Sequence, residues 1–255
     1  MKTVLITGGS RGIGQACVLA FARAGWQVAF SYHTQAEQAG QLVERVRQQG
    51  GAAACWQADV ADSSQVDRLF ARAEEAFDPI DALVCNAGIA HQGLLTDMTD
   101  AQWRRLMGVD LDGAFYCCRR ALPAMVRRHQ GSVVLISSMW GVTGGSCEAA
   151  YSAAKAGLIG LAKALAKEMG PSGIRVNCIA PGVIDTEMNG GLTEEDLAAL
   201  REETPLGRQG APEEVAEAAL FLCGEGARFI TGQVLGVELN PEAVKDAIQN
   251  AKENA

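Results

Sequence analysis

The chain is poor in several features that would each indicate a particular class of protein. Aromatic residues make up only 5% of its 255 residues. No stretch approaches the roughly 18–20 uninterrupted apolar residues that a membrane-spanning helix needs. The apolar run from Val4 to Ile6 stops at Thr7 and is too short for the apolar region of a signal peptide. We therefore expect a cytoplasmic protein with no membrane segment.

Positive charge and metal-ligand patterns are scarce as well. The chain has 22 Lys and Arg against 30 Asp and Glu, a formal net charge of −8, which argues against a general nucleic-acid or anionic-membrane surface. None of the eight cysteines belongs to a Cys-x-x-Cys pair, and His33, His91 and His129 are far apart, so no metal site is expected. Disulfide frameworks are typical of short secreted chains, which favours reduced, buried cysteines here.

The residues that are abundant predict a folded α/β protein. Hydrophobic residues reach 48%, and short apolar runs alternate with helical periodicity along residues 1–239. The expected strands are 3–7, 27–32, 52–58, 81–86, 132–137, 175–179 and 233–237, and the main expected helices are 13–24, 35–49, 63–77, 101–129 and 153–169. Strands that are apolar throughout are typical of a parallel sheet covered on both faces. This pattern predicts a Rossmann-type, doubly wound sheet of about seven strands in one domain.

Two segments depart from this alternation. Residues 182–210 form a polar, glycine-containing insertion of the kind that often serves as a mobile lid or binding loop. Residues 240–255 predict a short amphipathic helix, since Asn240 suits an N-cap and Pro241 suits the first helical position. This C-terminal tail lies outside the predicted domain and suggests no function.

A glycine-rich turn follows the first expected strand. Gly8, Gly12 and Gly14 lie between that strand and the first expected helix. Glycines in this position let the backbone approach a pyrophosphate, whose charge is favourable at a helix N-terminus. The alternative is a tight turn that uses glycine for steric reasons alone; the position directly after the first strand favours a dinucleotide site.

The end of the second expected strand indicates which dinucleotide the site would bind. A carboxylate about 20 residues after the glycines usually binds the adenosine ribose hydroxyls, but residues 27–36 contain no Asp or Glu. Arg11, with Ser31, His33 and Thr34, offers groups that suit a 2′-phosphate instead. This favours NADP(H) over NAD(H), although Arg11 can also be read as an ordinary solvated arginine.

A second constellation consists of Ser138, Tyr151 and Lys155. A tyrosine and a lysine four residues apart share one face of a helix, where the ammonium favours the phenolate and makes the phenol a usable proton donor or acceptor. Ser138 ends the fifth expected strand, where its hydroxyl can bind a substrate carbonyl. A Tyr-x-x-x-Lys pair alone is common by chance, but together with the serine and the nucleotide turn it is much more specific.

At these positions the chain resembles the short-chain dehydrogenase/reductase family over residues 1–239. Besides the glycine turn, the motifs that carry the resemblance are Asp59-Val60, Asn86-Ala87-Gly88, Ile136-Ser137-Ser138, Tyr151-Ser152-Ala153-Ala154-Lys155, and Asn177-Cys178-Ile179-Ala180-Pro181-Gly182 followed by Thr186. The resemblance implies that Tyr151 protonates a carbonyl, that Lys155 binds the nicotinamide ribose, and that Ser138 orients the carbonyl. Hydride comes from the cofactor.

The same resemblance implies a set of binding residues. The implied cofactor contacts, besides Tyr151 and Lys155, are Gly8, Ser10, Arg11, Gly12, Ile13, Gly14, His33, Asp59, Val60, Asn86, Ala87, Gly88, Pro181, Gly182, Ile184 and Thr186. The implied substrate contacts are Ser138, Trp140, Glu148 and Tyr151. Family members assemble as homotetramers or homodimers, so we expect an oligomer here.

The chain also departs from the family pattern. Cys85 replaces the first asparagine of Asn-Asn-Ala-Gly. Asp110 stands where the family has its fourth catalytic residue, an asparagine that is thought to hold a water through its main chain. An aspartate can preserve that main-chain role, but its carboxylate also lies near Lys155 in the expected fold. The C-terminal tail replaces the usual Gly-Gly ending.

Substrate assignment stays open between two resemblances. Residues 205–208 and 212–216 resemble 3-oxoacyl-[acyl-carrier-protein] reductases, and Arg127, Arg128 and His129 form a small basic patch that suits an acidic carrier or a helix C-terminus. Residues 138–148, with Trp140 and Glu148, resemble reductases that act on a 5-aminopentanoyl group on elongation factor P. A different class of hypothesis, based on Asp110 and the tail, is an NADPH-binding scaffold with impaired catalysis.

Overall fold

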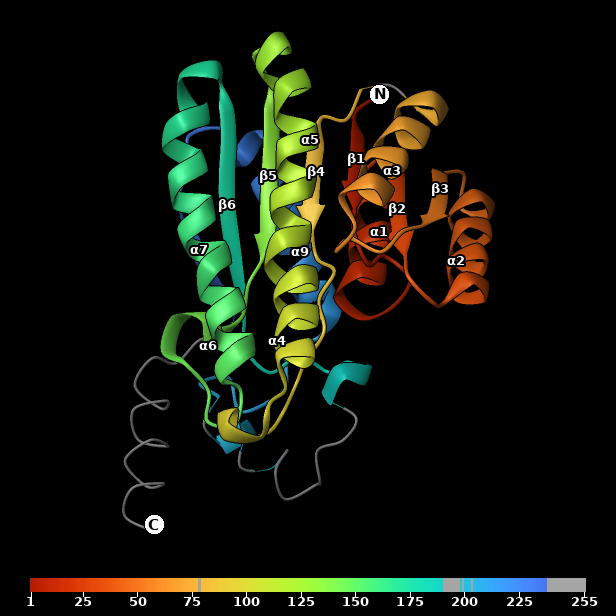
Figure 1. Ribbon diagram of the computed structural model, residues 1–255. Coiled ribbons are helices and arrows are strands. Elements are labelled where there is room, and N and C mark those ends of the chain that lie inside the picture. The colour runs from red at the N-terminus through yellow and green to blue at the C-terminus, as the bar shows by residue number, and fades with distance from the viewer. Residues whose placement is uncertain (78, 190–197, 199, 203, 238–255) are drawn as a thin grey trace.

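The protein is described from a computed structural model, which covers residues 1–77, 79–189, 198, 200–202 and 204–237. It contains a seven-stranded, all-parallel sheet in the order β3-β2-β1-β4-β5-β6-β7 (Figure 1). The strands are β1 Thr3–Ile6, β2 Gln27–Tyr32, β3 Ala52–Gln57, β4 Ala82–Cys85, β5 Gly131–Ile136, β6 Ile174–Pro181 and β7 Val234–Val237. The predicted fold class and all seven predicted strands are confirmed.

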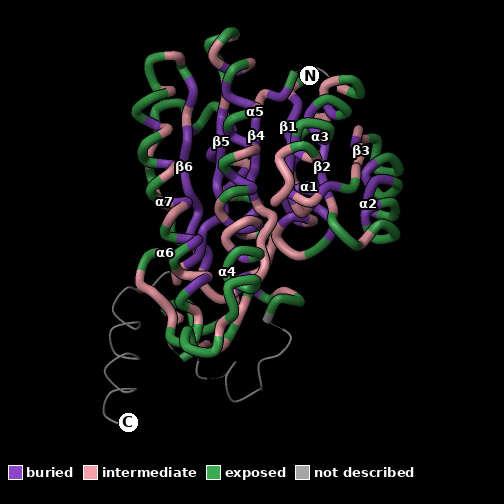
Figure 2. Tube along the Cα trace, in the orientation of Figure 1, coloured by how far each residue is buried: buried purple, intermediate pink, exposed green. Residues whose placement is uncertain are grey.

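Helices cover both faces of this sheet. One face carries α1 (Gly12–Arg23), α2 (Ala36–Gln48) and α9 (Pro212–Cys223), and the other carries α3 (Ser63–Ala76), α5 (Gly113–Arg128) and α7 (Ala149–Met169). Successive strand residues face opposite layers: Val4 and Ile6 pack under α1, whereas Leu5 packs under α3 and α5. The central strands β1, β4, β5 and β6 are therefore buried on both sides (Figure 2), which explains their continuous apolar sequence.

The strand order reverses between β1 and β4. From β1 the chain builds outward through β2 to β3, then returns to place β4 on the other side of β1 and continues to β7. In open α/β sheets, ligands bind at such a switch point, beyond the carboxyl ends of the strands. That edge lies at the bottom of Figure 1, where α7 begins and β4 points.

The helix predicted over 101–129 is three elements rather than one. It is divided into α4 (Asp100–Met107), a π-helical turn over Gly108–Asp112, and α5. The predicted helical segment is confirmed, with right-handed helical backbone at both joints, but periodicity did not reveal the local change of pitch. The π-helical turn contains the buried Asp110, whose side chain reaches residues of two other segments, and π-turns of this kind are frequent at functional sites.

Short elements complete the carboxyl edge. These are α6 (Met139–Thr143) and the 3-10 turns Leu95–Asp97 and Glu187–Asn189; two further 3-10 turns, Gly170–Ser172 and Glu225–Ala227, lie at the opposite edge. Ile184 and Gly210 form an isolated parallel bridge, so the two ends of the predicted insertion 182–210 lie together. Residues 190–197, 199 and 203 of that insertion, and all of the tail 240–255, lie outside the described residues. Among the described helices, none is long and apolar enough to cross a membrane.

Candidate active site

The glycine turn lies between β1 and α1, at the switch point of the sheet. Gly8 and Gly12 have positive φ values of 66° and 51°, which favour glycine. A Cβ on Gly14 would lie 2.0 Å from the carbonyl oxygen of Gly8, so any side chain there would force the turn open. Gly8, Gly12 and Gly14 therefore meet the steric needs of the turn itself, and the predicted approach to a pyrophosphate stays a prediction.

Thr7 and Asn86 fix this turn against the end of β4. The Thr7 hydroxyl accepts hydrogen bonds from the backbone N–H groups of Asn86 and Ala87, both at 3.0 Å. The Asn86 side-chain amide donates to the carbonyls of Thr7 and Gly8 at 3.1 and 3.0 Å. Asn86, predicted to contact the cofactor, thus shapes the turn that would hold it.

The N-terminus of α1 is built to receive an anion. Its N-cap residue, Arg11, makes no side-chain capping bond, and the first turn of the helix has no acidic residue. Unsatisfied N–H groups and the helix dipole favour a phosphate at such a position. The Arg11 side chain itself pairs with Glu187, with 2.9 Å between Nη1 and Oε2. The adjacent Ser10 hydroxyl donates to Gln35 at 3.3 Å.

The end of β2, where the adenosine would lie, offers no free carboxylate among the described side chains. Ser31 is buried, and its hydroxyl accepts a hydrogen bond from the N–H of Gly8, so it supports the turn. Asp59 pairs with Arg105 at 2.6 Å and with His33 at 3.7 Å. Partial burial disfavours the Asp59 carboxylate, but the hydrogen bonds from Arg105 and from the Ala61 N–H, together with the charge of Arg105, lower the pKa of Asp59.

The catalytic candidates meet around Lys155, on α7. Its ammonium lies 3.1 Å from Asp110 Oδ2 in the π-helical turn and donates to the carbonyl of Ile136, at the end of β5, at 3.2 Å. The other Asp110 oxygen accepts a hydrogen bond from the N–H of Ile89 at 2.8 Å. Both side chains are buried, with exposed fractions of 4% and 0%. This is a buried ion pair at the switch point.

The two charges support one another electrostatically. Burial raises the pKa of Asp110, and the Lys155 ammonium and the Ile89 N–H oppose that rise. Burial alone would lower the pKa of Lys155, but Asp110 and Tyr151 outweigh it, so the pKa of Lys155 is raised. The lysine therefore stays cationic in the protein interior.

Tyr151 lies one helical turn before Lys155 on α7. The lysine ammonium is 5.3 Å from the centroid of the tyrosine ring. The half-buried ring packs against a small apolar cluster that contains Leu106, Ala150 and Ala154. The Tyr-x-x-x-Lys spacing therefore places the Lys155 ammonium beside the tyrosine ring, and the predicted effect on the phenol stays a prediction.

Ser138 is held near the same helix by its neighbours. Its hydroxyl caps α6 by accepting from the N–H of Trp140 at 3.2 Å. The preceding Ser137 hydroxyl donates to the carbonyl of Lys155 at 2.8 Å, and a Cβ on Gly141 would lie 2.7 Å from that carbonyl carbon. Direct contact between α6 and α7 at Lys155 thus brings the serine, the lysine and the tyrosine to one edge.

Gly88 explains the glycine of the Asn-Ala-Gly motif. A Cβ there would lie 2.8 Å from Asp110 Oδ2 and 3.1 Å from Lys155 Nζ. At 2.8 Å from a Cβ, the Asp110 carboxylate would have to shift, so glycine leaves room for the ion pair as it stands.

The remaining predicted cofactor contacts lie along the same carboxyl edge of the sheet, but their side chains differ in burial and in the groups that they contact. Val60 and Ile184 are buried in the core, which leaves only their backbone toward a ligand. Gly182 donates its N–H to Val237, and Pro181 ends β6. The Thr186 methyl group lies 3.4 Å from the position of a Cβ on Gly12. Thr186 is therefore the member of this set that adjoins the glycine turn.

Glu148 and Trp140 lie beside the N-terminus of α7. Glu148 is the N-cap residue of α7, and Trp140 lies in α6 next to it across Gly145. Glu148 Oε2 is buried and receives no hydrogen bond from any residue that the structure describes. Burial raises the pKa of this carboxyl group. Its carboxyl group is thus an unsatisfied acceptor, three residues before Tyr151 in the chain.

Sequence reasoning missed several supporting residues. Ser137, Arg105 and Glu187 hold Lys155, Asp59 and Arg11 respectively. Ser137 sits next to a predicted residue, which is a weak signal, but Arg105 and Glu187 are 46 and 176 residues from their partners. Nothing in the sequence could have indicated those two contacts.

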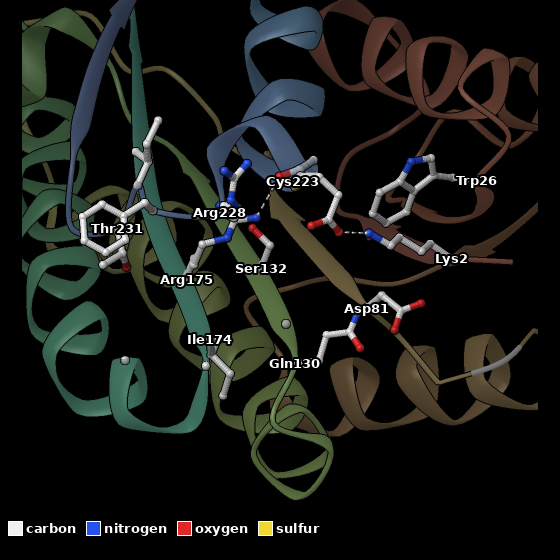
Figure 3. Close-up of a pocket in the computed structure, with 17 residues that line it drawn as sticks. Lys2, Trp26, Asp81, Gln130, Ser132, Ile174, Arg175, Cys223, Arg228 and Thr231 are labelled. Carbon is white, nitrogen blue, oxygen red and sulfur yellow. Dashed lines mark hydrogen bonds and ion pairs between the residues drawn. The ribbon is translucent and has the colours of Figure 1, made fainter.

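The opposite, amino edge of the sheet carries other features. A cavity of about 510 Å³ lies there, lined by residues including Lys2, Asp81, Arg175 and Glu225 (Figure 3). The predicted basic patch is at this edge too, at the end of α5 (Figure 1), and Arg128 is bound to Ile80 and Asp81. Neither feature adjoins the catalytic candidates.

Comparison with known proteins identifies the class. A family profile described as enoyl-(acyl carrier protein) reductase matches residues 8–239. YmfI of Bacillus subtilis, an uncharacterized oxidoreductase, is 40% identical over 237 residues, which cover 92% of this chain and 97% of YmfI. The 3-oxoacyl-[acyl-carrier-protein] reductase FabG of Chlamydia trachomatis is 39% identical over 241 residues, covering 93% and 96%.

A solved structure agrees with this match. The 3-oxoacyl-[acyl-carrier protein] reductase of Brucella melitensis superimposes with a TM-score of 0.87 at 35% identity, covering 92% of this chain and 89% of that one. The chain therefore belongs to the short-chain dehydrogenase/reductase family and is an oxidoreductase of that family.

Proposed function

We propose that the protein reduces a 3-oxoacyl thioester, carried on acyl carrier protein or coenzyme A, to the 3-hydroxyacyl form with NADPH. The observation that carries this proposal is the buried ion pair of Lys155 and Asp110 beside Tyr151, at the edge where the glycine turn lies. Similarity to two 3-oxoacyl-[acyl-carrier-protein] reductases supports the choice of substrate.

The residues fit a nicotinamide dinucleotide. The uncapped N-terminus of α1 and the glycine turn would hold the pyrophosphate. When bound, the coenzyme supplies the hydride that adds to the carbonyl carbon. Its nicotinamide end would lie toward Thr186 and the backbone of residues 181–184, and its adenosine toward His33 and Asp59. The occupied Asp59 carboxylate and the absence of Asp or Glu from residues 27–36 favour NADPH.

The side chains divide the proton chemistry between them. The Ser138 hydroxyl would bind the carbonyl oxygen, and the Tyr151 hydroxyl would donate its proton to that oxygen as the negative charge develops. The Lys155 ammonium would stabilise the phenolate that remains. Asp110 would keep this ammonium charged and correctly placed in a buried site, as an acidic replacement for the family's asparagine.

The decisive experiment is the Tyr151→Phe variant. With NADPH and acetoacetyl-CoA, we expect kcat to fall by about 10²–10⁴-fold while NADPH binding is kept, because only the proton donor is removed. Tyr116→Phe, on α5, is the matched control and should retain activity. Equal turnover by Tyr151→Phe and the unmodified protein would contradict the proposal.

A second candidate substrate is a ketone that carries an ammonium group, such as a 5-aminopentanoyl group on elongation factor P. The unsatisfied Glu148 carboxylate near Tyr151 favours it, since a cation would satisfy that acceptor. A higher kcat/KM for a cationic ketone than for acetoacetyl-CoA, lost in Glu148→Gln, would select this candidate. Equal losses for both substrates would reject it.

The alternative from another class is a coenzyme-binding scaffold with impaired catalysis. Asp110 motivates it, because the carboxylate neutralises the ammonium that would otherwise stabilise the Tyr151 phenolate. Tight NADPH binding without turnover of any ketone, and turnover restored by Asp110→Asn, would establish this alternative.

Assembly and location complete the proposal. Large apolar side chains are exposed on α4 and α5 (Trp103 and Phe115) and around α9 and β7 (Phe221, Phe229 and Leu235), which supports a homotetramer or homodimer. All eight cysteines are unpaired, which supports a reducing, cytoplasmic location. Light scattering on the full chain tests the assembly.

A further inference from the structure

An ion pair bridges the two sides of the proposed coenzyme site. Arg11 belongs to the glycine turn after β1, and Glu187 begins the 3-10 turn that follows β6. Their side chains meet with 2.9 Å between Nη1 and Oε2, although 176 residues separate them in sequence. The exposed fractions of the two side chains are 50% and 65%, so the contact lies at the surface.

Backbone contacts hold the Glu187 segment in place independently of this pair. The Asp185 N–H donates to the carbonyl of Gly210 at 2.9 Å, and the Gly210 N–H donates to Val183 at 2.9 Å. Thr186 reaches within 3.4 Å of the position of a Cβ on Gly12, against the glycine turn itself. Glu187 is thus presented to Arg11 by the fold.

The pair directs Arg11 away from the place where a 2′-phosphate would lie. β1 is flanked by β2 on one side and by β4, β5 and β6 on the other. The adenosine end of the coenzyme belongs beside β2, near His33, whereas Glu187 follows β6. While the guanidinium is paired with a carboxylate on the β6 side, its Nη1 donor is engaged there and not on the side of β2.

We propose that Glu187 is a specificity-determining residue, which competes with the adenosine 2′-phosphate for Arg11 and so weakens the preference for NADPH over NADH. This inference rests on the proposed function, because it assumes that the coenzyme occupies the glycine turn. NADH has no 2′-phosphate, so its binding does not require Arg11 to leave Glu187. The cost of breaking the pair therefore falls on NADPH alone.

The test measures coenzyme affinity in the full chain by fluorescence or calorimetry. In Glu187→Gln we expect NADPH to bind about two- to fivefold more tightly, since exposed ion pairs contribute little, and NADH to change by less than that. The NADPH gain should vanish in an Arg11→Ala background, because no guanidinium is left to release. Glu44→Gln, which removes an exposed carboxylate paired with Arg47 on α2, controls for net charge.

Salt provides a second readout. Added salt weakens the contact between Arg11 and the 2′-phosphate, which lowers NADPH affinity, but it also weakens the competing ion pair between Arg11 and Glu187. Without Glu187 only the first effect remains, so NADPH affinity should become more sensitive to salt. Weaker NADPH binding in Glu187→Gln would overturn the inference, since the carboxylate would then help to hold the coenzyme. Equal changes for both nucleotides would also overturn it. Failure of the unmodified chain to bind either nucleotide would overturn the proposed function and this inference together.

Discussion

The two edges of the sheet each contain a lysine paired with an acid, but they place the pair in different surroundings. At the carboxyl edge, Lys155 and Asp110 are 3.1 Å apart with exposed fractions of 4% and 0%. At the amino edge, Lys2 and Glu225 are 2.8 Å apart with exposed fractions of 39% and 80%. The shorter contact is the exposed one, so distance does not distinguish the pair beside Tyr151.

Burial distinguishes it. At the surface, water solvates each charge well, so forming an ion pair adds little to stability. In the interior no water solvates the charges, so removing one partner leaves the other charge uncompensated and destabilises the fold. The amino edge has a cavity of about 510 Å³, yet Lys2 there is paired with Glu225, and Arg175 is bound to the backbone carbonyl of Gly224. We therefore place the proposed catalytic site at the buried pair next to Tyr151 rather than at this hollow.

The largest expected effect comes from removing the buried cation. Lys155→Met keeps the volume but leaves Asp110 buried without its partner, and we expect a loss of about 3–5 kcal/mol in the free energy of unfolding. Chemical denaturation without coenzyme measures it. Adding Asp110→Asn to this variant should recover more than half of the loss, because the uncompensated charge is gone. If the double variant recovers nothing, lost packing rather than the uncompensated charge causes the loss of stability in Lys155→Met.

The stability of Lys155→Met should also depend on pH. Burial raises the pKa of Asp110 above its ordinary value of 3.8, and without Lys155 that rise is less opposed. A carboxyl group with a raised folded-state pKa stabilises the fold in its neutral form, below its unfolded pKa, and this contribution is lost as pH rises through the folded pKa. The variant should therefore lose stability relative to the unmodified protein between acidic and neutral pH. A constant difference would contradict the assignment.

A smaller effect is expected from a single methyl group beside the pair. Gly88→Ala places a Cβ 2.8 Å from Asp110 Oδ2 and should cost about 1–3 kcal/mol in the free energy of unfolding through overpacking. It should also reduce reductase activity. Gly170→Ala at the amino edge is the matched control, since its Cβ meets nothing within 4 Å and φ there is −53°. Equal losses in the two variants would remove the distinction between the edges.

The smallest effect is expected at the amino edge. Lys2→Met breaks the exposed contact with Glu225 and should leave the denaturation midpoint unchanged within error, because solvent replaces the lost interaction. Denaturation at low and high salt measures this. A loss as large as that of Lys155→Met would show that exposure is not the deciding factor.

The fold was predictable because its signals are local and repeated. Apolar runs of strand length, separated by helical periodicity, fix a parallel sheet whatever the details of packing. The glycine turn and the Tyr-x-x-x-Lys spacing are local as well, since Tyr151 and Lys155 are neighbours on one helix. The π-helical turn was missed because periodicity does not reveal a local change of pitch. The contacts that Asp110 makes there, with Ile89 and Lys155, join residues that are distant in sequence.

The amino-acid sequence by itself determined the order of strands and helices, the glycines that allow a close backbone approach, and the pairing of a phenol with an ammonium on α7. Only the tertiary structure decided which charges are shielded from water and what meets them: Asp110 under Gly88, Ser137 against Lys155, and Glu187 across from Arg11. The physical reason is that periodicity and steric freedom act over a few residues. Desolvation and ion pairing depend on which distant segments the fold brings together.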